Sequence, residues 1–121
     1  PLPQLLSRRR RDRLSRMSQF DVYRNPDRDT QARIPYVVVL QSGLLQGLDH
    51  HVVAPLRIAE DAAVVPVLRL NPMTIVAGQR FHIRVQDIAT VPRRMLKSPV
   101  ANLSSQREEI LAALDFLFTG F

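Results

Sequence analysis

The sequence contains no cysteine. This excludes disulfide scaffolds, cysteine nucleophiles and thiolate metal sites, and it is typical of a reducing compartment, so we expect a cytoplasmic protein. Glycine is also scarce, and Gly43 and Gly47 stand alone with no lysine after them, so the chain has no glycine-rich loop for a phosphate group. The longest apolar runs, Ile34–Leu40 and Ala62–Leu68, have seven residues each, far fewer than the roughly 20 that a membrane-spanning helix needs.

The net charge of +6 is concentrated at the start of the chain. Residues 1–16 hold six arginines against one aspartate, whereas residues 17–121 hold eleven basic and ten acidic residues. The nearly neutral body lacks the charge that is typical of a nucleic-acid-binding surface. We predict that residues 1–16 form a basic, disordered extension, with a basic amphipathic helix as the alternative, and that residues 17–121 form one domain.

Alternating and β-branched runs predict strands in the first part of the body. The predicted strands are Phe20–Arg24, Pro35–Gln41, Val52–Ile58 and Val64–Leu70. The second of these is a continuous apolar run, so we expect it to be buried on both faces. Pro55 marks the third as an edge strand or a bulge, because proline donates no backbone hydrogen bond.

The strongest hairpin pattern lies in the second half of the chain. Its arms, Thr74–Val76 and Phe81–Gln86, flank the turn sequence Ala77-Gly78-Gln79-Arg80. Apolar and polar residues alternate in the second arm, which predicts one dry and one wet face. A further segment, Ile88–Val91, extends or bends that arm.

Near the C-terminus the apolar period becomes that of a helix. The predicted apolar stripe is Ile110, Leu114, Leu117, Phe118 and Phe121. Ser105 and Glu108 have capping-box spacing, with Ser104 as a competing cap, and Gly120 is expected to end the helix. We therefore predict an all-β or α+β fold, in which a small antiparallel β-domain is closed by one C-terminal helix.

Candidate catalytic and metal sites are few. Asp49-His50-His51 lacks the additional ligands of a metal centre, so we interpret its histidines as polar loop residues. Metal-free RNA cleavage is the enzymatic hypothesis that the composition allows, with candidate residues on neighbouring strands. These residues are Arg69, Thr74, Arg80, His82 and Arg84. The structural alternative is a solvated polar face opposite the dry face of the hairpin.

Six short segments carry a further pattern along residues 17–121. They are Gln19-Phe20-Asp21-Val22-Tyr23, Val39-Leu40-Gln41-Ser42 with Leu44-Leu45, Val53-Ala54-Pro55-Leu56, Ala89-Thr90-Val91-Pro92, Leu103-Ser104 with Ile110, and Phe118-Thr119-Gly120-Phe121. In their order and spacing these segments resemble the CcdB toxins of toxin–antitoxin modules. The resemblance implies an SH3-related, barrel-like antiparallel sheet with a final helix, a homodimer, and no catalytic residue, metal or cofactor.

The resemblance also implies a function. Family members bind the A subunit of DNA gyrase, trap its cleaved-DNA state and arrest the cell. The antitoxin, CcdA, wraps the toxin with a disordered segment, and the pair represses its own operon, with operator DNA contacted only through the antitoxin. Carried over by position, the gyrase-binding residues are Ser42, Leu44, Leu45, Asp115, Thr119, Gly120 and Phe121.

Two surfaces correspond to those that the antitoxin approaches in the family. One is the loop Arg24–Arg33, where Arg24, Arg28 and Arg33 would attract an acidic segment, and the other is Arg57–Ala62. A solvated loop is the alternative interpretation of the first.

Two positions depart from the family pattern. Thr119 stands where a family tryptophan stacks on a gyrase arginine, and threonine makes no cation–π contact. Asp115 replaces an asparagine that donates and accepts hydrogen bonds. We expect the ring of Phe121 to face a partner protein, with packing into the protein's own core as the alternative. An RNA-cleaving toxin and an inactive antitoxin-binding homologue remain alternative functions.

Overall fold

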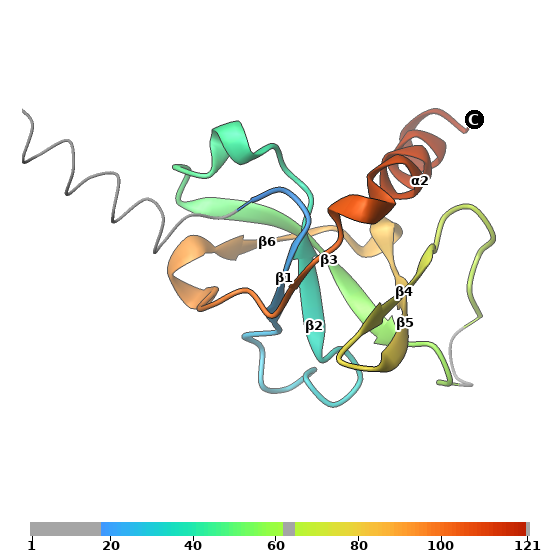
Figure 1. The fold of residues 1–121 in the computed structure, drawn as a ribbon, viewed down its shortest axis with the longest axis horizontal. Coiled ribbons are helices and arrows are strands. Elements are labelled where there is room, and N and C mark those ends of the chain that lie inside the picture. Colours follow the sequence, from blue (N-terminus) through green and yellow to red (C-terminus); the bar gives the residue numbers. More distant parts are fainter. Residues whose placement is uncertain (1–17, 62–64, 121) are drawn as a thin grey trace, which may run out of the picture.

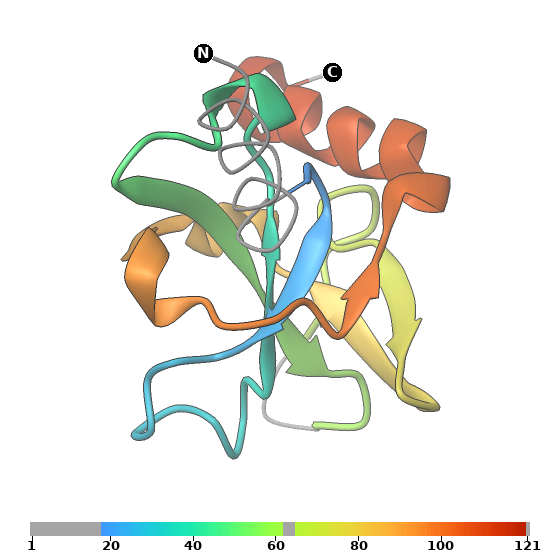
Figure 2. The ribbon, with the colours of Figure 1, turned by 60° about the vertical axis from the view of Figure 1, so that its left-hand side comes forward.

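One antiparallel sheet, bent into a nearly closed barrel, and one C-terminal helix make up the described part of the molecule (Figures 1 and 2). The computed structural model describes residues 18–61 and 65–120, so the predicted extension of residues 1–16 lies outside the described residues. In the described ranges the strands are β1 (Asp21–Arg24), β2 (Tyr36–Val39), β3 (His50–Ile58), β4 (Met73–Val76), β5 (Gln79–Ile83), β6 (Ala89–Pro92) and β7 (Ala101–Asn102). The predicted fold class is confirmed.

The long strand β3 organises the sheet. The strand order is β4-β5-β3-β2-β1-β7, and β6 pairs with the first half of β3 while β5 pairs with its second half. Pro55 lies between the two halves, after the last pair with β6 at Val53 and before the first pair with β5 at Leu56. The proline therefore needs no donor on that side. The prediction of an edge or bulge is wrong, because Pro55 lies in a central strand at the point where the neighbouring strand changes.

Two apolar clusters lie on opposite faces of the sheet. The larger one packs under the helix and contains Phe20, Val22, Val38, Leu40, Ala54, Leu56, Val76, Phe81, Ile83, Val85, Leu103, Ile110 and Ala113. The smaller one contains Tyr23, Val37, Val39, Val53 and Leu96. Because alternate residues of β2 enter the two clusters, the continuous β-branched run is buried on both faces, as predicted.

The predicted hairpin is confirmed as β4 and β5, joined at Ala77 and Gly78. Both turn residues have positive φ, 52° and 78°, which is the geometry of a type I′ turn. The edge strand β4 is tied to the helix start, because Thr74 Oγ1 donates to Gln106 Oε1 at 2.5 Å and Gln106 Nε2 donates to the carbonyl of Met73 at 2.8 Å. The second arm ends at Ile83, and a 3₁₀ turn, η2 (Val85–Asp87), leads into β6.

The prediction of a strand over Val64–Leu70 is wrong for the residues that the structure describes. Residues 65–72 form a loop in which the amide of Leu70 donates to the carbonyl of Val67 at 3.1 Å. The Asn71 side chain fixes this turn by accepting from the amide of Val67 at 2.9 Å. β4 takes the pairing place beside β5 instead, so the apolar side chains of this run stay exposed, 88% in the case of Leu68.

The C-terminal helix, α2 (Arg107–Thr119), follows a 3₁₀ turn, η4 (Ser104–Gln106). The predicted serine caps are wrong: α2 has Gln106 at its N-cap with no side-chain capping bond, and Asn102 Oδ1 accepts from the amide of Ser104. Gly120 ends the helix as predicted, at φ 79°, with its amide donating to the carbonyl of Phe116.

The apolar stripe of α2 differs from the predicted one near its end. Ile110 and Ala113 are fully buried against the sheet, and Leu114 packs partly against the same cluster. The last turns of α2 extend beyond the barrel (Figure 1), and Phe118 is 73% exposed. Phe121 lies outside the described residues, so the orientation of its ring stays a prediction.

Candidate functional site

The end of α2 presents both polar and apolar groups to solvent. Asp115, Thr119 and Gly120 are all exposed, and Thr119 Oγ1 donates to the carbonyl of Asp115 at 2.6 Å. This bond occupies the threonine hydroxyl, and the ring of Phe118 lies open beside it. Sequence reasoning assigned Phe118 to the core stripe; its place beyond the end of the supporting sheet was the signal missed.

A short 3₁₀ turn, η1 (Gly43–Leu45), carries the other predicted gyrase-binding residues. Ser42 caps it, because its Oγ accepts from the amide of Leu44 at 3.1 Å. Leu44 is 94% exposed, and Leu45 and Leu48 are about half exposed. Two leucines held outward in this way are not needed by the core, which makes them available to a partner.

The two groups of residues lie at the same end of the molecule in both views (Figures 1 and 2). We call the exposed apolar side chains at this end the apical patch: Leu44, Leu45, Leu48 and Phe118. Ser42, Asp115 and Thr119 belong to the elements that carry it. Leu48 and Phe118 are the members that sequence reasoning missed.

A buried histidine supports the leucine-bearing loop. His51 is fully buried, and its Nε2 lies 3.1 Å from the carbonyl of Gln46 while its Nδ1 lies 3.3 Å from Gln41 Nε2. Burial lowers the pKa of His51, and the nearby Arg93 acts in the same direction. The interpretation of the two histidines as loop residues is therefore wrong: they begin β3, where His50 is exposed and His51 is internal.

The predicted antitoxin loop, between β1 and β2, is built around Asn25. This buried side chain donates to Thr30 Oγ1 at 2.8 Å and to the carbonyl of Ile34 at 2.9 Å, and it accepts from the amide of Asp27 at 3.0 Å. The three predicted residues of this loop, Arg24, Arg28 and Arg33, are all exposed.

This loop forms one wall of a cavity that we call the loop groove, of about 690 Å³. Its floor is apolar and includes Val37, Val53, Pro55 and Val91, whereas Asp27, Arg28, Asp29 and Asp87 are its charged lining residues. Arg28 thus lines the groove, but Arg33 does not.

The second predicted antitoxin region is held by ion pairs. Arg57 contacts Asp61 at 3.0 Å, and Arg80 contacts Glu60 at 3.0 Å. Ala62, at the end of this region, lies outside the described residues.

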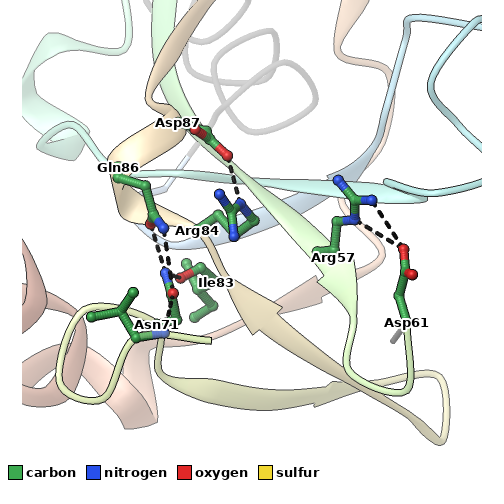
Figure 3. A network of polar contacts seen from close by, with 8 residues as sticks. Arg57, Asp61, Asn71, Ile83, Arg84, Gln86 and Asp87 are labelled. Carbon is green, nitrogen blue, oxygen red and sulfur yellow. Dashed lines mark hydrogen bonds and ion pairs between the residues drawn. The ribbon is translucent and has the colours of Figure 1, made fainter. Parts of the chain in front are cut away.

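The candidate ribonuclease residues are not gathered into one site. Figure 3 shows Arg84 reaching Asp87, at 2.6 Å, and Asn71 bonded to Gln86 and to the carbonyl of Ile83. Thr74 is buried and shares the face of Phe81, its partner in the ladder, so it points away from the face of His82. Each of the five candidates has a contact of its own within the protein, and Arg69 lies over the Phe116 ring at 4.7 Å.

Among residues 18–61 and 65–120, no group of three or more histidine, aspartate or glutamate side chains is placed to hold a metal ion. Within the same ranges, no helix has the length and apolar character to cross a membrane.

Comparison with known proteins identifies the fold and the family. A solved structure described as an endoribonuclease from mycobacterial species superposes with a TM-score of 0.60 at 11% sequence identity, covering 83% of this chain and 88% of that chain. At this identity the likeness shows a shared fold alone. No curated protein matches the chain. The family model described as CcdB protein matches residues 19–120, which is nearly the whole of the described barrel and helix. The chain therefore belongs to the CcdB family of toxins.

Proposed function

We propose that this toxin binds the A subunit of DNA gyrase through its apical patch and traps the enzyme on cleaved DNA. The observation that carries the proposal is the exposure of large apolar side chains on η1 and at the end of α2, with Leu44 at 94% and Phe118 at 73%. An aromatic residue and leucines that the fold leaves uncovered are suited to anchor a protein interface. The family supplies gyrase as the partner.

Phe118 compensates for the threonine that replaces the family tryptophan. The hydroxyl of Thr119 is already bonded to the carbonyl of Asp115, and threonine has no aromatic face. The exposed ring of Phe118, one residue earlier, offers such a face to an arginine of the partner. A cation–π contact of this kind contributes roughly 0.5–2 kcal/mol.

The proposal includes the other partners of a CcdB module. A CcdA-like antitoxin neutralises the toxin by binding the loop that carries Arg24, Arg28 and Arg33 and the neighbouring Arg57–Ala62 region, and the complex represses its operon through the antitoxin. The exposure of these arginines and the adjoining loop groove support a binding role for the loop. The active toxin is proposed to be a cytoplasmic homodimer.

A plasmid cleavage assay tests the proposal. The full chain, gyrase of the natural host, supercoiled plasmid and ATP are incubated together, and the products are treated with detergent and protease. We expect linear DNA to accumulate with the wild type, to fall about tenfold or more with Leu44→Ser combined with Phe118→Ser, and to be unchanged with His82→Ala. Absence of linear DNA at high toxin excess would sink the gyrase proposal.

The RNA-cleaving alternative makes the opposite prediction. Under that alternative, Arg84→Ala or His82→Ala abolishes toxicity in cells, and deletion of Gly120 and Phe121 leaves toxicity intact. Under the gyrase proposal the deletion abolishes toxicity and the two alanine variants retain it. An inactive homologue would show antitoxin binding and no toxicity in any variant. Growth of cells expressing each variant separates the three outcomes.

A further inference from the structure

A second cavity adjoins the loop groove. It has a volume of about 630 Å³ and lies between the end of β1, the β1–β2 loop and the 3₁₀ turn η3 (Arg93–Met95). We call it the basic pocket; its lining residues are Arg24, Asn25, Pro26, Gln31, Arg94, Met95 and Lys97. Asn25, Pro26 and Met95 also line the loop groove, so the two cavities meet there and form one channel.

The two ends of this channel carry opposite charge. At the basic end, Arg24, Arg94 and Lys97 are exposed, and none of them makes an ion pair within residues 18–61 and 65–120. At the other end the groove is lined by three aspartates and one arginine. Asp87 is paired with Arg84, whereas the carboxylate of Asp29 is exposed to solvent.

The part between the two ends is apolar. Val37 and Val53 are almost completely covered by their neighbours in the smaller core cluster, and they form the floor together with Pro55 and Val91. Met95, 41% exposed, lies where the cavities join. A ligand that fills the channel must therefore have an apolar middle and ends of opposite charge.

We propose that this channel binds a linear segment of the antitoxin in one orientation. The acidic end of the segment lies over Arg24, Arg94 and Lys97, its apolar residues lie on the valine floor, and its basic end lies beside Asp29. The inference rests on the proposed antitoxin partnership and adds to it Arg94 and Lys97, which no sequence pattern indicated, together with the direction of binding.

A peptide fits the channel better than a nucleic acid does. No aromatic ring is among the residues that line either cavity, so the channel offers no platform on which a base could stack. The aspartates of the loop groove would repel a phosphate backbone along half of the channel.

Two synthetic peptides test the inference. One carries glutamates followed by leucines and valines, and the other carries leucines and valines followed by lysines. Their affinities for the full-length toxin are measured by fluorescence anisotropy at low salt, where charge contacts are least screened. The variants are Arg94→Glu at the basic end and Asp29→Lys at the other end, and Arg33→Glu is the matched control, because Arg33 lies in the same loop but lines neither cavity.

We expect a crossed pattern. Arg94→Glu weakens the glutamate peptide about tenfold and leaves the lysine peptide no weaker, whereas Asp29→Lys does the reverse. Arg33→Glu changes either affinity less than twofold. Equal loss with Arg94→Glu and Arg33→Glu, or no binding of either peptide to the wild type, overturns the inference.

The antitoxin of the natural module separates this inference from the proposed function. If that antitoxin binds the wild type and Arg94→Glu equally tightly, the channel inference fails and the antitoxin partnership stands. If the antitoxin does not bind the wild type, both fail. The plasmid cleavage assay is expected to give the same linear DNA with Arg94→Glu as with the wild type, because the channel lies apart from the apical patch.

Discussion

His51 is the residue on which the shape of the leucine-bearing loop depends. Its ring is fully buried, and its two nitrogens lie near the carbonyl of Gln46 and the amide of the Gln41 side chain. Gln41 in turn donates to the carbonyl of Leu45 at 3.2 Å and accepts from the amide of Val52 at 2.9 Å. A charge on His51 would disturb contacts that hold Leu44 and Leu45 outward.

Acid should therefore destabilise the protein through His51. Burial lowers its pKa below the usual 6.5, so between these two values the unfolded chain binds a proton that the folded protein does not. The free energy of unfolding falls as the pH drops below 6.5 and stops falling, for this group, below the folded pKa. Urea unfolding of the wild type and of His51→Gln at pH 7 and at about pH 5 measures the effect.

His50 provides the matched control, because it is the adjacent residue and is exposed. We expect His50→Gln to retain the pH dependence of the wild type, and His51→Gln to be less stable at pH 7 but less sensitive to acid. An identical pH dependence in His51→Gln and the wild type would show that His51 does not titrate between these values.

At the scale of elements, the hairpin was predictable and the β3–β4 connection was not. The turn chemistry of Ala77-Gly78 and the alternation after it determine β4 and β5 locally. The run Val64–Leu70 has the composition of a strand, but the sheet already has β4 beside β5, and Asn71 fixes the run as a turn. Competition between segments for one place in a sheet is not visible in the pattern of either segment.

The hairpin turn also contains a local strain. Ala77 has a φ of 52°, a conformation that costs a residue with a Cβ roughly 1 kcal/mol. Asparagine tolerates this region and is preferred before glycine in a type I′ turn. We expect Ala77→Asn to raise the free energy of unfolding by about 0.5–1 kcal/mol, as measured by urea denaturation.

Gly78→Ala is the companion variant. Its φ is 78° and open space surrounds the position of a Cβ, so any loss of stability arises from the backbone and not from a clash. We expect a loss of about 1 kcal/mol. A stability gain in Gly78→Ala, or a loss in Ala77→Asn, would contradict the assigned turn geometry.

For the whole molecule, the two core clusters are joined through single strands. Alternate residues of β2 and β3 supply both clusters, so neither cluster can open without disordering the other. Tyr23 lies in the smaller cluster, and Tyr36 packs edge-on against Phe81 beside the larger one. The only two tyrosines of the chain therefore report on different cores.

We expect one cooperative unfolding transition. In protein labelled with fluorotyrosine, the fluorine resonances of Tyr23 and Tyr36 should disappear with the same urea midpoint. Ile110→Ala, which removes side-chain volume from the larger cluster only, should lower both midpoints equally, by an amount that corresponds to about 2–5 kcal/mol. Two separate midpoints would show that the faces of the sheet unfold independently.

The sequence allowed the family, the fold and part of each candidate surface to be predicted. The serine and leucines of η1 were found through the resemblance, since a short exposed turn has no periodicity of its own. Phe118 was assigned to the core because helical periodicity shows which residues share a stripe, but not where the supporting sheet ends. Arg94 and Lys97 were not found, because they reach Arg24 only through the folding of η3 against the end of β1.

The bond between Gln106 and the first carbonyl of β4 limits how copies of the toxin can assemble. A strand from another chain would have to displace this side-chain amide before it could continue the sheet past the hairpin. We therefore expect protomers to associate through side chains, without a shared intermolecular ladder. Proteins held together in that way can exchange partners without unravelling any backbone pairing.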